Sequence, residues 1–136
     1  MKEVVVRSIV EGNVESTAIV SPMSISFLEG VDPETGNIID HENPLFGLSI
    51  ANKIFVFPES KGSTVGSYVI YGLRVNGVAP IAFVTNNAEP IIIAGAILAN
   101  ITLVDQLDKD VLKSIKNGDY IKIDTSRNLI KFGNKE

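Results

Sequence analysis

The amino-acid sequence predicts a mixed α/β fold with a β-rich core and short helices. Most of its apolar segments are short, rich in Val and Ile, and bounded by Gly, Pro, Asn or Asp, as strands commonly are. One segment instead repeats its apolar residues with the period of a helix. The chain has 136 residues, of which 45% are hydrophobic and 21% are charged. This size and balance predict one folded domain over residues 1–136, without a linker or an internal repeat.

The first third of the chain predicts two strands and a long loop. Residues 2–10 alternate and are rich in Val, and residues 14–20 follow a Gly-containing turn, so both segments favour strands. Residues 21–36 are dense in Ser, Pro, Gly and Asp, which predicts a long loop or a hairpin. Long irregular segments in compact domains are more often functional than short connections.

The middle of the chain predicts a change from strand to helix. Residues 53–57 form an apolar strand that a proline stops, and a polar turn follows at residues 59–64. Beyond it, the apolar residues that share one predicted helical face are Val65, Tyr68, Val69, Gly72 and Leu73. We expect Ser63 or Thr64 at the helix N-cap. Gly62 therefore lies where the strand becomes a helix.

The rest of the chain predicts further short elements. In chain order they are a buried strand over 80–85, a short helix or strand over 91–99, a strand over 101–104, a brief helix over 108–115 capped by Asp108, and a closing hairpin of 119–124 and 128–132.

The composition excludes several classes of function. The sequence has no Cys, which excludes disulfides, a thiolate nucleophile, and an iron–sulfur cluster held by this chain alone. Twelve basic against 16 acidic residues lack the positive charge that nucleic-acid binding requires. The longest apolar run, residues 91–99, is far shorter than the ~20 residues of a membrane span, and the N-terminus does not resemble a signal peptide. We expect a cytoplasmic protein without a nucleic-acid or membrane partner.

Ser63 is the candidate catalytic residue. Backbone N–H groups at a helix start lack intrahelical partners and carry partial positive charge, so they stabilise an anion such as a substrate carboxylate or a serine alkoxide. The same position also fits a plain helix cap, and the local pattern leaves both interpretations open. A phosphate-binding Walker A loop is excluded, because Lys61 precedes Gly62. The sequence does not place His41, the only histidine, beside Ser63, so a Ser-His triad is not predicted.

Several segments together resemble one family: the small subunits of archaeal phosphomevalonate dehydratase, which are similar to the swivel domains of aconitase X proteins. The matching segments are EGNVESTAIVSPMSISF (11–27), GVDPETGNIID (30–40), GLSIANKIFVFPESKGSTVGSYV (47–69), APIAFVT (79–85), EPIIIAGAILANITLVD (89–105) and the hairpin within 118–132. The loop GVDPETG followed at this distance by KGST is the most specific part of the match.

The resemblance implies a swivelling β/β/α domain with a barrel-like core, which docks as a small subunit onto a larger one that holds a [4Fe-4S] cluster. The implied reaction is an aconitase-type dehydration of mevalonate 5-phosphate, a phosphorylated hydroxy acid, in isoprenoid biosynthesis. Ser63 would be the base, Lys61, Gly62 and Thr64 would bind substrate, and no residue of this chain would bind metal. Two departures from related enzymes are Val65, where aconitases have Arg, and an interrupted His-Pro-Leu run that leaves His41 without an assigned role.

Two alternatives remain at this point. The chain could belong to another aconitase X dehydratase, for instance one acting on a hydroxyproline, since spacing alone does not select the substrate. It could also be a noncatalytic partner-binding domain that kept the swivel fold. That second alternative would not need Ser63.

Overall fold

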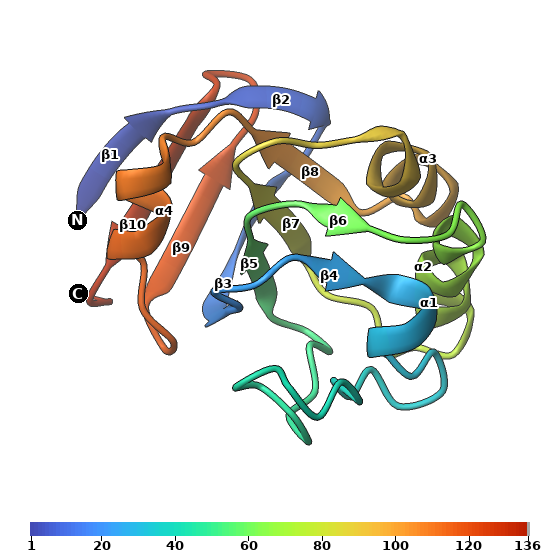
Figure 1. Cartoon of the computed structure of the whole chain (residues 1–136). Helices are drawn as coiled ribbons and strands as arrows, with labels where there is room; N and C mark the ends of the chain where they lie inside the picture. Colours follow the sequence, from blue (N-terminus) through green and yellow to red (C-terminus); the bar gives the residue numbers. More distant parts are fainter. Residues whose placement is uncertain (136) are drawn as a thin grey trace.

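Residues 1–135 are described by a computed structural model, in which short strands alternate with four helices (Figure 1). The elements are β1 (Lys2–Val5), β2 (Arg7–Val10), β3 (Asn13–Val20), β4 (Ile25–Ser26), α1 (Phe27–Gly30), β5 (Ile54–Phe57), β6 (Ser60–Lys61), α2 (Gly66–Val75), β7 (Ala82–Thr85), α3 (Pro90–Ala99), β8 (Thr102–Asp105), α4 (Lys109–Ser114), β9 (Tyr120–Asp124) and β10 (Leu129–Gly133).

Eight of the strands form one sheet that curls into a nearly closed barrel. Their order is β1-β10-β9-β3-β5-β7-β8-β2. The two edge strands, β1 and β2, are consecutive in the chain and are separated only by the buried Val6. The N-terminal segment therefore crosses from one edge of the sheet to the other, and the backbone N–H of Val6 donates to the carbonyl of Asn128 at the crossing. The predicted β-rich, barrel-like core is confirmed.

The four strands β3, β5, β7 and β8 run parallel to one another and form the half of the barrel that faces the helices. Every residue of β5, β7 and β8 is buried, because a parallel strand is covered on both faces. The other half consists of antiparallel pairs, including the predicted closing hairpin of β9 and β10. The crossover helices α2 and α3 pack against each other on one side of the barrel, and α4 lies on the other side (Figure 1).

The parallel strands alternate between two hydrophobic clusters. Ile54 and Val56 of β5 point into the barrel, where they join apolar residues of β9 and β10. Phe55 and Phe57 point outward, where with Phe27 of α1 they pack beneath α2 and α3. The helix layer is therefore fixed to the sheet by interlocking aromatic rings, which are oriented edge to face.

Helix α2 differs from its predicted form in the face that it buries. Its buried residues are Gly66, Ser67, Ile70 and Leu73, whereas Tyr68, predicted on the apolar face, is 68% exposed. The small residues explain the difference, because they let α2 approach its neighbours closely. A Cβ atom on Gly66 would lie 3.3 Å from Ile91 and 3.4 Å from Phe27. Hydropathy alone does not detect a helix face made of Gly and Ser.

The segment between β3 and β5 is more structured than the predicted loop. Residues 21–36 contain β4 and α1, which sequence reasoning missed because both elements are very short. The following residues form isolated bridges, Val31 with Ile38 and Asn37 with Ser49. Residues 91–99, left open as a helix or strand, lie in helix α3, and the Asp108 cap of α4 is confirmed. Within residues 1–135, none of the helices has the length and apolar character that crossing a bilayer requires.

Candidate active site

The candidate site is a turn at residues 62–65, held between β6 and α2. Strand β6 pairs in parallel with β4, with Ile25 opposite Ser60 and Ser26 opposite Lys61. These two short strands run side by side away from the barrel, and β4 leads into α1 whereas β6 leads into α2 (Figure 1). The turn is therefore anchored on one side by the β4–β6 pair and on the other by α2.

Gly62 supplies the backbone conformation that the turn requires. Its φ angle is +93°, a region that residues with a Cβ atom rarely adopt. A Cβ atom at this position would also lie 3.0 Å from the side-chain oxygen of Ser26. Glycine is thus required at this position by the geometry of the turn itself.

Ser63 is exposed, and its side chain makes one hydrogen bond within the turn. The Oγ atom accepts from the backbone N–H of Val65 at 3.2 Å. Ser63 and Thr64 are not at the N-cap position, which Val65 occupies without a side-chain cap, so the prediction of a Ser or Thr cap is wrong. The reason is one extra tight turn before the helix, in which the carbonyls of Ser63 and Thr64 accept from the N–H groups of Gly66 and Ser67.

This turn changes the electrostatics expected at Ser63. The N–H groups that begin α2 are largely used by carbonyls three residues earlier, so fewer of them are free than at an uncapped helix start. The donor that remains for the Ser63 Oγ is the N–H of Val65. It lies at the positive end of the α2 dipole, so one backbone donor and the dipole together favour negative charge on this oxygen.

Lys61 and Thr64 flank Gly62 and Ser63 along the chain, and all four residues are exposed. Within residues 1–135, the ion pairs shorter than 4.0 Å do not include Lys61, so its ammonium group is free to meet an anion. The structure places Lys61 at the end of β6, and Gly62, Ser63 and Thr64 in the exposed turn that follows. It places His41 outside this turn, where the imidazole stacks on Phe46 at 4.2 Å between ring centroids.

Glu89 supports the turn from the start of α3, and sequence reasoning missed it. Ser60, which is 3% exposed, donates from its hydroxyl to the Oε1 atom of Glu89. This bond joins β6, three residues before Ser63, to the residue that precedes Pro90 and α3. The Glu-Pro pair just before residues 91–99, which the sequence leaves open as a helix or strand, was the one available signal.

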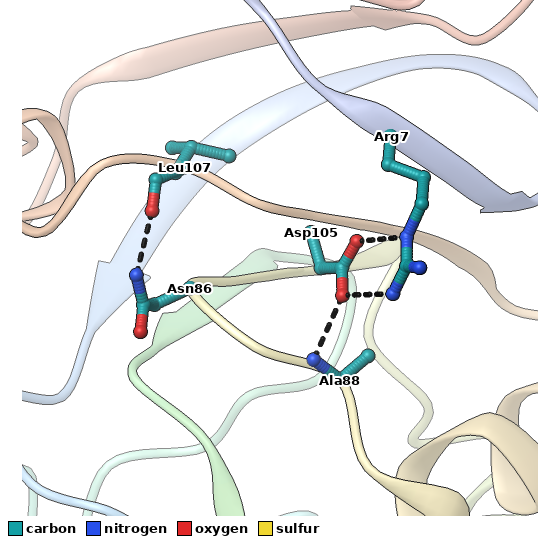
Figure 2. Close-up of polar contacts among 5 residues, drawn as sticks. All are labelled: Arg7, Asn86, Ala88, Asp105 and Leu107. Carbon is teal, nitrogen blue, oxygen red and sulfur yellow. Dashed lines mark hydrogen bonds and ion pairs between the residues drawn. The ribbon is translucent and has the colours of Figure 1, made fainter.

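A second missed feature is the buried carboxylate of Asp105 at the end of β8 (Figure 2). It accepts from Nε and Nη2 of Arg7 at 2.8 and 2.7 Å, and from the backbone N–H of Ala88 at 2.9 Å. The hydrogen bond and charge of Asp105 raise the pKa of Arg7 above its usual value. The Arg7–Asp105 pair joins β2 to β8, and the bond from Ala88 to Asp105 fixes the loop that carries Glu89. In the same loop, the side-chain amide of Asn86 donates to the carbonyl of Leu107 at 2.7 Å (Figure 2).

The side chains of this chain do not fit an iron–sulfur cluster. The sequence contains no Cys. In the part of the chain that the structure describes, no three His, Asp or Glu side chains come together in a way that could hold a metal ion. A cluster would therefore need ligands from another chain.

Comparison with known proteins gives a consistent result. The aconitase X swivel domain family matches residues 3–132. The phosphomevalonate dehydratase small subunit of Methanocaldococcus jannaschii is 50% identical over 129 residues, covering 95% of this chain and 96% of the relative. The protein of the same name from Methanococcoides burtonii is 46% identical over 124 residues, covering 91% and 90%, respectively.

A solved structure agrees with the sequence comparisons. The crystal structure of Thermococcus kodakaraensis aconitase X, in its holo-form, superposes with a TM-score of 0.92 at 44% identity, covering 97% of this chain and 98% of that chain. The family match, the relatives and the shared fold all span nearly the whole chain. This chain belongs to the aconitase X swivel domain family.

Proposed function

We propose that this chain is the small subunit of a cytoplasmic phosphomevalonate dehydratase, a hydro-lyase that converts mevalonate 5-phosphate to trans-anhydromevalonate 5-phosphate. The observation that carries the proposal is the agreement in name and length among its relatives. Proteins called phosphomevalonate dehydratase small subunit match it at 44–50% identity, and those of Methanocaldococcus jannaschii and Methanococcoides burtonii are covered over at least 90% of their length.

Ser63 is the proposed base. In the dehydration, a proton leaves the carbon next to the carboxylate and its bonding electrons form the new carbon–carbon double bond. The hydroxyl on the neighbouring carbon departs with its bonding pair as hydroxide, which takes a proton from solvent to become water. The Oγ atom of Ser63, as the alkoxide, would take the first proton and become a hydroxyl. Its geometry supports this role, because the oxygen is exposed, faces a backbone N–H donor and lies near the positive end of α2.

The neighbouring residues have roles that follow from their chemistry. Lys61 would attract the carboxylate or the phosphate of the substrate, since its ammonium group lacks an ionic partner among residues 1–135. Gly62 lets the backbone approach the substrate closely, and Thr64 would offer its hydroxyl as a hydrogen-bonding group.

A large subunit would complete the site. It would hold the [4Fe-4S] cluster, for which this chain lacks ligands, and would cover the exposed turn to exclude water. The apolar side chains beside the turn suit such a docking face. Leu28, Val65 and Tyr68 are 41%, 48% and 68% exposed, although each is large and apolar or aromatic.

The test is reconstitution. We expect co-expression with a cluster-bearing large subunit to give a complex that dehydrates mevalonate 5-phosphate under anaerobic conditions, whereas the purified 136-residue chain gives no turnover. Turnover of a hydroxyproline, but not of mevalonate 5-phosphate, by the same cluster-loaded complex would contradict the proposed substrate. Turnover by the chain alone, with no large subunit detectable by mass spectrometry, would contradict the two-subunit arrangement.

A further inference from the structure

The loop that follows α1, drawn in teal in Figure 1, exposes apolar side chains. Ile39, Phe46 and Leu48 are 43%, 47% and 52% exposed. Their neighbours Ile38 and Leu45 are only 1% and 2% exposed and anchor the loop in the core beneath the helices. Packing of the fold therefore does not account for the three exposed side chains, and exposed apolar residues that gather on one surface mark an interaction site.

Backbone hydrogen bonds gather these residues and hold the loop in one conformation. The N–H of Ile38 donates to the carbonyl of Leu48 at 2.8 Å, and the N–H of Gly47 donates to the carbonyl of Ile38 at 2.9 Å. These bonds place Ile39 beside the strand-like segment that contains Phe46. A surface that is already ordered loses less conformational entropy when a partner binds.

The loop surface is continuous with the turn that carries Ser63. Gly66, three residues after Ser63, packs against α1, since a Cβ atom on it would lie 3.7 Å from the backbone nitrogen of Leu28. At the end of α1, the carbonyl of Gly30 accepts from the N–H of Ile39 at 2.9 Å. The surface therefore extends from the turn across α1 to the loop.

The turn by itself is too small to hold two proteins together. A stable interface takes about 20 to 30 residues from each partner. Residues 62–68 fall well short of this number, whereas together with residues 28–30 and 39–48 they reach about 20. We call these three segments the docking face. A subunit that covers Ser63 reaches the size of a stable interface by extending over the whole docking face.

The docking face also lies in an acidic part of the chain. Residues 28–52 contain five acidic residues and neither Lys nor Arg. Three of the acidic side chains are exposed: Glu29, Glu34 and Glu42. Among residues 1–135, the ion pairs within 4.0 Å do not involve these three carboxylates. Lys53 follows the segment and Lys61 lies beside the turn, so carboxylates still outnumber ammonium groups at this surface.

We infer that the large subunit binds the docking face with a surface that is apolar at its centre and carries Lys or Arg at its edge. Basic groups there would complement the exposed carboxylates. A second copy of this chain does not fit, because a symmetric contact would place the same acidic surface against itself. The inference rests on the proposed two-subunit function, and it adds where the second subunit binds and the chemistry of its surface.

The test measures binding of the full chain to the cluster-bearing large subunit by surface plasmon resonance. We expect Ile39→Ser/Leu48→Ser to weaken binding at least about tenfold, because both side chains leave the centre of the interface. The matched control is Val5→Ser/Ile97→Ser, which changes apolar side chains that are 71% and 62% exposed outside the docking face. It should bind like the unmodified chain. Unfolding midpoints in urea should stay the same in both variants, since all four positions are exposed.

Charge reversal tests the chemistry of the partner surface. Glu29→Lys/Glu42→Lys should slow association about tenfold at low salt and reduce its salt dependence, because charges at the edge of an interface act mainly on the association rate. The matched control, Glu3→Lys/Glu11→Lys, makes the same change in net charge on β1 and just after β2. It should associate like the unmodified chain.

The outcomes separate this inference from the proposed function. Unchanged binding by Ile39→Ser/Leu48→Ser, or an equal loss in its control, would overturn the docking face. Unchanged or faster association after charge reversal would show that the partner surface is not basic. Failure of the unmodified chain to bind the large subunit, or a homodimer that Ile39→Ser/Leu48→Ser breaks, would rule out the large subunit as the occupant. A complex that needs the docking face but does not dehydrate mevalonate 5-phosphate would contradict the proposed function alone.

Discussion

Replacing Ser63 by Ala should separate catalysis from stability. The structure gives Ser63 one side-chain hydrogen bond, exposed and 3.2 Å long. Losing it should lower the free energy of unfolding by no more than about 0.5 kcal/mol, as for other surface substitutions. Losing a general base lowers the rate by about 10² to 10⁴, which corresponds to about 3 to 5 kcal/mol in the activation barrier.

Ser67 and Thr64 are the matched controls, because their hydroxyls lie in the same few residues. Ser67 is 8% exposed, and its hydroxyl donates to the carbonyl of Thr64 at 2.9 Å, so Ser67→Ala should cost about 1 kcal/mol of stability. Thr64→Ala should have little effect on stability because its side chain is exposed. The expected order of stability loss therefore puts Ser67 first, whereas the expected order of rate loss puts Ser63 first.

The assay combines two measurements on each variant. Urea unfolding of the isolated chain gives stability, and turnover of mevalonate 5-phosphate by the cluster-loaded complex, at saturating large subunit, gives the rate. A Ser63→Ala complex that turns over at the unmodified rate would refute the assignment of Ser63 as base. Equal rate losses at all three positions would show that the integrity of the turn, rather than one oxygen, determines the rate.

Three further predictions concern the packing that holds the turn. Gly95→Ala should lower the free energy of unfolding by about 1 to 2 kcal/mol in urea unfolding, because its Cβ would lie 2.5 Å from Ile70 Cδ1. The double variant Gly95→Ala/Ile70→Val should lose less stability than the sum of the two single variants. Strictly additive losses would contradict the contact. Gly62→Ala should cost about 1 to 2 kcal/mol, since φ is +93°, and an unchanged unfolding midpoint would rule out the strained conformation. Ser60→Ala removes the hydrogen bond from Ser60 to Glu89 and should speed amide hydrogen exchange in the turn, whereas Glu89→Gln, which keeps an acceptor oxygen, should not. Equal exchange in both variants would exclude a supporting role for the Ser60–Glu89 hydrogen bond.

The sequence predicted most elements because their signals are local. An apolar run that ends at a proline predicts strand β5, and an Asp at the N-cap predicts α4, so neighbouring residues are enough to predict both elements. The buried face of α2 was not predictable in this way, because Gly66 is buried for its small size and not for its hydropathy. The sequence predicts a polar turn at residues 59–64 between the strand and the helix, but the extra tight turn that moves the N-cap to Val65 depends on backbone angles that the sequence does not specify.

The supporting contacts were missed because they join residues far apart in the chain. Arg7 and Asp105 are separated by 98 positions, and Ser60 and Glu89 by 29. Each pair forms only after the parallel strands have aligned and the N-terminal segment has closed the barrel. A polar residue that ends a strand is compatible with many partners, so the sequence alone does not select Arg7 for Asp105.

The Arg7–Asp105 pair gives a last prediction, because its two members differ in burial. The Arg7 side chain is 50% exposed, whereas the Asp105 side chain is fully buried. Removing the carboxylate in Asp105→Asn leaves Arg7 able to return to water. Removing the cation in Arg7→Met leaves a buried carboxylate with only the Ala88 N–H as partner. Arg7→Met should therefore destabilise the chain more than Asp105→Asn at pH 8, since an unpaired buried charge is the costlier defect.

A variant that keeps a cation at this position tests the cause. Arg7→Lys retains a positive charge for Asp105 but loses the paired Nε and Nη2 hydrogen bonds of the guanidinium group. If the unpaired buried charge causes the destabilisation, Arg7→Lys should keep more stability than Arg7→Met, as measured by urea unfolding at pH 8 in matched salt. Equal losses in the two variants would show that the lost guanidinium contacts and packing of the Arg7 side chain, and not the loss of its charge, cause the destabilisation.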